Sequence, residues 1–255
     1  MAAGDSGHEA ESASEPVVRL DRQATWLFRS FLPDESDDAN SLGFEFELSF
    51  DLGSYDVKNI AYVELNDFPR PIPGQPIGNP EPAGFEAATG IGDILTGFWF
   101  SRKGGHHGAH HLAWGFGAQL PTAADDSLGS GKWSVGPSFD YEYEKGRLFA
   151  GVIAMQLWSV AGDSDRADVS MLIVKPFVYY SLTEKWDLMY VPYGISVYWD
   201  KPSGEKAYVP LGGGAQRHFK FGSVEMNLGA ALYKNVVRPT KGPNWDLRFL
   251  LEFQF

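Results

Sequence analysis

The stretch WDLRFLLEFQF, residues 245–255, shows a strict period of two. Every odd position in it, from Trp245 to Phe255, carries an apolar side chain. Every even position is polar, with the exception of Leu250. Because successive side chains of a β-strand point to opposite faces, this alternation predicts a strand with one apolar face and one polar face.

The same alternation recurs along most of the chain. It is clear in residues 44–52, 112–120, 133–144 and 224–232. It is weaker in residues 24–32, 59–68, 92–101, 147–160, 168–182, 186–200 and 207–219. Together with residues 245–255, these segments predict twelve strands. Residues 17–31 also fit a helical period, so a helical start to the first segment stays open.

The composition excludes several classes of protein. The chain has no cysteine, which excludes disulfide scaffolds, zinc–thiolate sites and cysteine nucleophiles. The net charge is −12, from 21 basic and 33 acidic residues, and no basic cluster is present, so nucleic acid is not an expected partner. Aromatic residues make up 15% of the 255 positions, which together with 29 glycines favours an all-β chain.

The connections between the predicted strands alternate in length. Long ones lie at residues 33–40, 69–90, 121–132, 159–168, 200–206 and 236–243; short ones lie at 53–58, 145–146, 183–185 and 220–222, with 101–111 as the exception. Membrane barrels sort their connections in this way, with short periplasmic turns and long external loops. We therefore predict an all-β fold, a twelve-stranded antiparallel transmembrane β barrel with both termini periplasmic. A soluble sandwich is the alternative.

The ends of the chain differ in character. Residues 1–19 are acidic and rich in small side chains, which predicts a flexible tail, whereas residues 20–255 form the predicted barrel. Residues 1–16 contain no basic start and no apolar run, so we expect a mature form without a signal peptide, located in the bacterial outer membrane. Outer-membrane lipid and lipopolysaccharide are then the expected surroundings.

Several ordered motifs point to a family. They lie in residues 90–101 (GIGDILTGFWFS), 120–137 (LPTAADDSLGSGKWSVGP), 158–168 (WSVAGDSDRAD), 209–214 (VPLGGG), 220–222 (KFG) and 242–249 (GPNWDLRF). In these motifs the chain resembles the outer-membrane barrel family known as "MetA-pathway of phenol degradation", also called neuromedin-U-like or simply transporter. The resemblance is good over residues 90–255 and a matter of pattern over 20–68. The Pro-rich residues 69–90 and the His-rich residues 101–111 depart from it.

The resemblance implies a Gram-negative outer-membrane barrel that passes aromatic or other hydrophobic small molecules. It also implies that the C-terminal strand ending at Phe255 is recognised by the barrel-insertion machinery. We expect passive uptake of a small hydrophobic solute, no cofactor and no enzymatic activity. A closed structural or partner-binding barrel without transport is the main alternative. A barrel lipid hydrolase is a minor one, in which His218 would act with Ser223 or Asn227.

Charged residues on the polar faces are the candidate selectivity residues. We expect them to point into the lumen, where charges tune the selectivity of a barrel. The alternative is an interior filled by hydrogen-bonded side chains, as in narrow barrels. The set comprises Glu45, Glu47, Asp140, Glu142, Lys175, Arg217, Asp246, Arg248 and Glu252.

Two predicted external loops are rich in carboxylates. They carry Asp125, Asp126, Lys132, Asp163, Asp165, Arg166 and Asp168. Carboxylate oxygens there suit Ca²⁺, which could bridge to lipopolysaccharide phosphates. The alternative, which we favour, is that these side chains cap turns and pair with Lys132 or Arg166.

One cluster has the residue types of a metal site. His106, His107, His110 and His111 lie in one predicted turn. Imidazoles four positions apart share a face only on a helix, and the neighbouring glycines disfavour a helix. A solvated turn is therefore the favoured interpretation, and no metal is expected.

Overall fold

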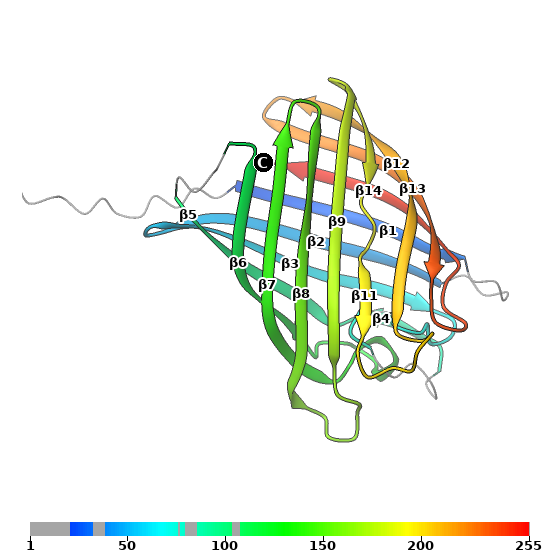
Figure 1. The fold of residues 1–255 in the computed structure, drawn as a ribbon. Coiled ribbons are helices and arrows are strands. Elements are labelled where there is room, and N and C mark those ends of the chain that lie inside the picture. Colours follow the sequence, from blue (N-terminus) through cyan, green and yellow to red (C-terminus); the bar gives the residue numbers. More distant parts are fainter. Residues whose placement is uncertain (1–20, 33–38, 76, 80–85, 104–107, 255) are drawn as a thin grey trace, which may run out of the picture.

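The computed structural model describes residues 21–32, 39–75, 77–79, 86–103 and 108–254. Their β-strands join in one antiparallel sheet that closes on itself (Figure 1). The elements are β1 (Asp21–Leu32), β2 (Ala39–Leu52), β3 (Tyr55–Phe68), β4 (Ala88–Ile91), β5 (Ile94–Arg102), β6 (His110–Leu120), a 3-10 turn η1 (Asp126–Leu128), β7 (Lys132–Lys145), β8 (Leu148–Gly162), β9 (Ser170–Thr183), β10 (Trp186–Tyr190), β11 (Ile195–Tyr198), β12 (Ala207–Phe221), β13 (Val224–Val237) and β14 (Trp245–Gln254).

The strands make a twelve-membered barrel because two of its members are interrupted. β4 and β5 both pair with β3, and β10 and β11 both lie between β9 and β12. The remaining strands pair in chain order, and β14 closes the ring by pairing with β1. The prediction of a closed twelve-stranded antiparallel barrel is confirmed. Residues 21–32 form a strand, so the helical alternative is wrong for them, while residues 1–20 lie outside the described part.

The two interruptions differ from the single strands expected at residues 92–101 and 186–200. In the second, Pro192 has no N–H to give to a sheet ladder, and Gly194 has a φ of 154°. The ladder with β9 stops at Tyr190 and resumes at Ile195. The residues between them, 191–194, line the interior cavity described below, except for Gly194.

The connections sort by length between the two ends of the barrel, as the sequence predicts. The turns between β2 and β3, β7 and β8, β9 and β10, and β12 and β13 lie at one end, which we call the short-turn rim. Gln23 of β1 pairs with Gln254 of β14, so the first and last strands also begin and end there. The connections at the opposite end, the long-loop rim, include residues 69–87 and 121–131.

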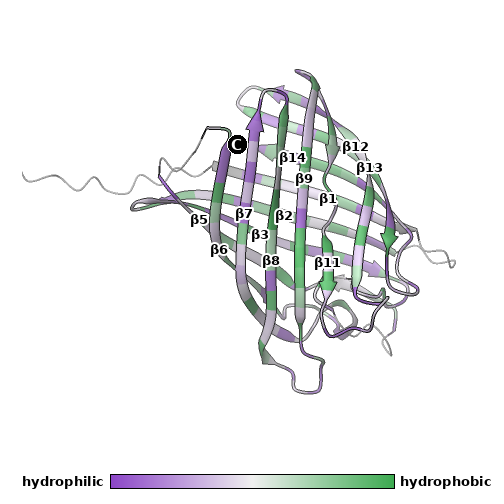
Figure 2. Ribbon diagram, viewed as in Figure 1, coloured by the Kyte–Doolittle hydropathy of each residue, from purple (hydrophilic) through white to green (hydrophobic). Residues whose placement is uncertain are grey.

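The outer face of the barrel is an apolar belt. Exposed large side chains on it include Trp26, Phe28, Phe46, Trp114, Phe116, Trp133, Trp158, Trp186, Leu211, Leu228 and Phe249. Hydrophobic and hydrophilic positions alternate along single strands (Figure 2). An exposed belt of this extent is unusual on a soluble monomer and is typical of a surface that faces lipid.

The described residues include no α-helix long and apolar enough to cross a membrane.

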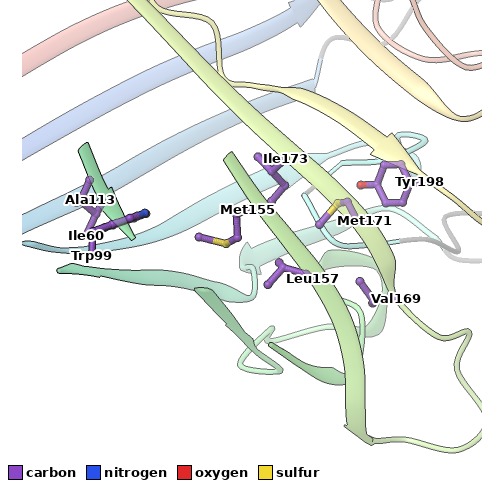
Figure 3. Packing of buried hydrophobic residues seen from close by; sticks show 9 residues of the cluster. All are labelled: Ile60, Trp99, Ala113, Met155, Leu157, Val169, Met171, Ile173 and Tyr198. Atoms are coloured by element: carbon purple, nitrogen blue, oxygen red, sulfur yellow. The ribbon is translucent and has the colours of Figure 1, made fainter. Parts of the chain in front are cut away.

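Part of the inner face is apolar as well. Nine buried side chains from β3, β5, β6, β8, β9, β11 and the residue before β9 gather there (Figure 3): Ile60, Trp99, Ala113, Met155, Leu157, Val169, Met171, Ile173 and Tyr198. Trp99 fits because Gly97 leaves room for the indole, whose Nε1 donates to Ser138 Oγ at 2.9 Å. The sequence predicted charged side chains on the inner face, so this apolar wall is a finding of the structure.

Candidate functional site

At the long-loop rim, a segment of the β3–β4 connection contacts tyrosines of the barrel wall. We call residues 70–75 and 77–79 the inner loop; residue 76 lies outside the described part. Tyr198 Oη donates to the Gly74 carbonyl at 3.1 Å and accepts from the Gly78 N–H at 3.3 Å. Tyr208 Oη donates to the Pro73 carbonyl. Ile72 and Asn79 are fully buried, and Asn79 donates to the Ser127 carbonyl at 2.9 Å, so the inner loop also packs against the β6–β7 loop.

A buried charge network lies directly against the inner loop. Arg29 of β1 pairs with Glu64 of β3 at 2.9 Å, and it donates to Gln75 of the inner loop at 3.2 Å. Tyr193, in the interruption between β10 and β11, stacks on the Arg29 guanidinium at 3.8 Å and donates to Glu64 at 3.0 Å. Tyr62 also donates to Glu64, at 2.8 Å. The network joins the inner loop to three parts of the wall.

Arg29, Glu64 and Tyr193 were not among the site residues predicted from the sequence. Arg29 and Glu64 lie in the weakly alternating segments 24–32 and 59–68. The sequence pattern there does not distinguish a buried charged side chain from a solvated one. The available signal was that each stands among apolar neighbours. Their pairing joins positions far apart in the sequence, which a pattern of period two does not report.

Below this network lies a cavity of about 500 Å³. Its lining includes six of the predicted lumen residues: Glu45, Glu47, Glu142, Lys175, Arg248 and Glu252. Two others lie next to it and are buried: Asp140 pairs with Lys58, and Asp246 pairs with Arg248 at 3.0 Å. The structure therefore brings eight of the nine predicted residues to the inner face.

The ninth, Arg217, was placed wrongly. It pairs in register with Leu228, which is exposed on the outer belt. Its guanidinium lies 5.0 Å from the Phe219 ring centroid and 5.7 Å from that of Trp186. A charged side chain near the end of a strand keeps its head at the polar boundary while its stem covers apolar surface, so the outward position is compatible with lipid.

Ion pairs bridge the lumen from wall to wall. Lys175 of β9 pairs with Glu45 of β2 at 2.9 Å, and these strands lie on opposite sides of the ring. Lys58 of β3 contacts Glu142 of β7 at 2.7 Å and also pairs with Asp140. All four side chains of the Lys175–Glu45 and Lys58–Glu142 pairs line the same cavity, so charged groups occupy part of its width.

The loop carboxylates are engaged with their own loops. Asp125 Oδ1 accepts from the Ser127 hydroxyl at 2.7 Å and from the Ser127 N–H at 2.8 Å, and these hydrogen bonds hold the pKa of its carboxyl below the ordinary value. Asp163 accepts from Asp165 N at 2.8 Å, and Asp126 lies 3.7 Å from Arg166. Asp168 pairs with Lys132 at 3.2 Å. Among the described residues these contacts match the turn-capping alternative, and a calcium site stays a prediction.

The histidine turn gives no metal site in the described part of the chain. His106 and His107 lie outside it. His110 Nδ1 is 2.7 Å from Tyr141 Oη, and His111 Nδ1 is 3.6 Å from Glu142. The two imidazoles are therefore directed to different partners.

His218, the residue on which the hydrolase alternative depends, has partners on both ring nitrogens. Nε2 lies 2.7 Å from Asp187 Oδ2, and Nδ1 lies 2.7 Å from Asn227 Oδ1. Asn227 in turn donates to Glu252 at 2.7 Å. A nucleophile activated by His218 would need a hydroxyl at one of these nitrogens.

No protein-family model matches the sequence, and no curated protein matches it either. Among solved structures, an outer membrane channel from Pseudomonas putida F1 is similar over 97% of this chain and 100% of that chain, with 12% identity and a TM-score of 0.63. A FadL homologue from Pseudomonas aeruginosa is similar over 92% and 89%, with 9% identity and a TM-score of 0.39. At this identity the likeness to the first structure shows a shared fold: both chains form a barrel of the kind found in outer membrane channels.

Proposed function

We propose that this chain is an outer-membrane barrel for passive uptake of small hydrophobic or aromatic molecules. The observation that carries the proposal is the interior. A cavity of about 500 Å³, the size of a small-molecule site, adjoins an apolar inner wall that contains Ile60, Trp99 and Ile173. A channel for ions and sugars needs a wide polar bore, and a structural barrel needs no cavity.

The proposed route leaves the lumen through the wall. The ladder between β10 and β12 ends at Met189 and Gly214, and the ladder between β11 and β12 resumes at Ser196 and Tyr208. The inner edge of this gap carries Val191, Pro192 and Tyr193, which also line the cavity. An apolar solute captured at the long loops would pass the inner loop and exit sideways into lipid, without energy input.

A second candidate is a closed barrel that binds a partner protein. The inner loop and the paired charges of the lumen favour it, because both narrow the interior. The two candidates differ in whether a solute enters. A closed barrel leaves the cavity empty of apolar solutes, whereas an uptake channel fills it.

The test uses two measurements on the folded barrel. Single-channel conductance is recorded in a planar bilayer with and without benzyl alcohol. In parallel, Gram-negative cells producing the protein are exposed to 1-N-phenylnaphthylamine, a dye that fluoresces on reaching lipid and that the lipopolysaccharide leaflet excludes. Dye uptake above that of cells without the protein is the expected result. The absence of both dye uptake and aromatic-sensitive current would overturn the proposal in favour of the closed barrel.

We infer that the protein performs no covalent chemistry. The contacts of His218 with Asp187 and Asn227 support this inference. We further propose that the short-turn rim faces the periplasm, that lipopolysaccharide surrounds the long-loop rim, and that the terminal strand, ending at Phe255, engages the insertion machinery. Lipid turnover by wild type that Ser223→Ala abolishes would contradict the absence of chemistry.

A further inference from the structure

The charges that line the cavity do not balance. Five carboxylates, on Glu45, Glu47, Glu142, Asp187 and Glu252, face three cations, on Lys58, Lys175 and Arg248. Each cation is already paired: Lys175 with Glu45, Lys58 with Glu142 and Asp140, and Arg248 with Asp246. The surplus in the cavity is therefore carboxylate.

The surplus includes the carboxylates of Glu47 and Glu252. Glu47 has no hydrogen bond or ion pair of its own among the described residues, and it shares the field of Lys58 with Asp140 and Glu142. Glu252 accepts from Asn227 at 2.7 Å, an uncharged donor. Both lie within electrostatic range of Glu45. Carboxylates crowded in a partly desolvated cavity need a neutralising partner, either a cation or a proton, because water does not screen them fully.

The facing wall of the same cavity is aromatic. Phe149 of β8 and Phe177 of β9 lie with ring centroids 5.3 Å apart, and Tyr179 follows at 6.2 Å from Phe149. All three rings line the cavity. The Lys175–Glu45 bridge shows that β9 faces β2 across the lumen, so this aromatic wall stands opposite the strand that carries Glu47.

We propose that the cavity binds amphipathic cations, with an ammonium group at Glu47 and Glu252 and an apolar or aromatic body against Phe149, Phe177 and Tyr179. The proposal deepens the proposed uptake function by naming its solute class, and it rests on that function. An ammonium group supplies the cation that the lining lacks, in charge-assisted hydrogen bonds. The aromatic wall removes the body of the solute from water, and it attracts a nearby cation as well.

The experiment compares three solutes with one apolar body: 4-phenylbutylammonium, 4-phenylbutanol and 4-phenylbutyrate. Binding to the purified full chain in a neutral detergent is measured by calorimetry. Methylammonium, which has the charge without the body, is the fourth probe. We expect the ammonium to bind at least about tenfold more tightly than the alcohol, and the carboxylate most weakly of the three aromatic probes. We expect methylammonium to bind far more weakly than 4-phenylbutylammonium.

Two matched variants assign the effect to the cavity. Glu47→Gln removes the charge and keeps the shape, so it should reduce the preference for ammonium over alcohol to about threefold or less, with little change for the alcohol. Glu225→Gln is the control, because Glu225 pairs with Lys220 at 2.7 Å on an exposed surface outside the cavity. It should leave all affinities unchanged.

Each outcome decides one of the two proposals. Equal binding of ammonium and alcohol overturns the cation preference, and so does equal binding of methylammonium and 4-phenylbutylammonium. If Glu47→Gln weakens the binding of all three aromatic probes equally, the proposed role of Glu47 is overturned. Selective ammonium binding with neither dye uptake in cells nor aromatic-sensitive current would keep the site and overturn the transport function. Dye uptake in cells together with equal binding of the ammonium and the alcohol would keep the transport function and overturn the cation preference.

Discussion

The Asp93 carboxylate accepts hydrogen bonds from both the backbone N–H and the hydroxyl of Ser130, at 2.7 and 2.8 Å. Gln119 Nε2 donates to the same carboxylate at 2.8 Å, and Ala123 N donates at 3.2 Å. Asp93 lies in the interruption between β4 and β5, so one side chain fastens that break to the β6–β7 loop. The β6–β7 loop is thereby held against the break between β4 and β5.

Replacing Asp93 by Ala should loosen this loop. Hydrogen bonds to a charged group contribute about 1.5–3 kcal/mol each, and part of the loss is recovered by water, so we expect the free energy of unfolding to fall by about 2–4 kcal/mol. Urea unfolding of the folded barrel in detergent measures the change. Asp126→Ala is the control: its carboxylate is exposed and 3.7 Å from Arg166, which predicts a change of about 0–1 kcal/mol. Equal effects of the two variants would contradict the assignment.

The pair of Arg29 and Glu64 should behave as a unit. Both side chains are 3% exposed, and removal of one partner leaves an uncompensated buried charge. Arg29→Met or Glu64→Gln alone should therefore destabilise the barrel by about 3–5 kcal/mol. The double variant should be less unstable than either single one, since neither charge is left behind. Heat-induced loss of the folded band on a gel gives the order of stability of the three variants. If the destabilisation of the double variant equals the sum of the two single ones, the coupling is contradicted.

The sequence predicted most of the fold because the outer belt imposes alternation. The alternation is clear in three of the strands, because a membrane barrel of this kind needs an apolar outer face and these strands have a polar inner face. They are residues 245–255, 133–144 and 224–232. In β8 and β9 the alternation is weaker for a structural reason. Met155, Leu157 and Ile173 point inward into the apolar wall, so these strands are apolar on both faces. The weak alternation was itself the sign of that wall.

The candidate site was less predictable than the fold. Inward placement followed from parity for eight lumen charges. Arg217 follows the same parity but lies on the outer face, because its neighbour Gln216 faces the cavity; its charge alone had suggested an inward position. The inner loop and the Arg29–Glu64 pair depend on contacts between distant parts of the chain. Period-two reasoning is local, and it contains no information on which loop turns inward.

The contact of Asp168 with Lys132 should give the β8–β9 loop a defined dependence on pH. Lys132 and Ser159 hold the pKa of the Asp168 carboxyl below its ordinary value. The ionised form is therefore the stabilised one: its contribution is complete above the ordinary pKa of about 4 and is lost as pH falls through the lower pKa of the folded state. We expect the loop to be docked equally at neutral pH and at pH 5, and to loosen only in stronger acid.

An environment-sensitive label measures this docking. The chain has no native cysteine, so a single one introduced as Asp165→Cys reports on the loop alone. In an Asp168→Asn background the acid transition should disappear, and the loop should be loosened at every pH. A transition that persists in that background would assign the pH dependence to another group.

The bridge between Lys175 and Glu45 should limit ion flow through the lumen. The two side chains meet at 2.9 Å from opposite walls, and they obstruct the cavity with both charge and volume. The double variant Lys175→Ala with Glu45→Ala removes both partners, so neither is left without the other, and it widens the passage. Single-channel conductance should therefore rise by about twofold or more. The matched control is Lys220→Ala with Glu225→Ala, an exposed pair at 2.7 Å that lies outside the cavity. Unchanged conductance in the lumen variant would place the limiting constriction at the inner loop instead, where Tyr198 holds Gly74.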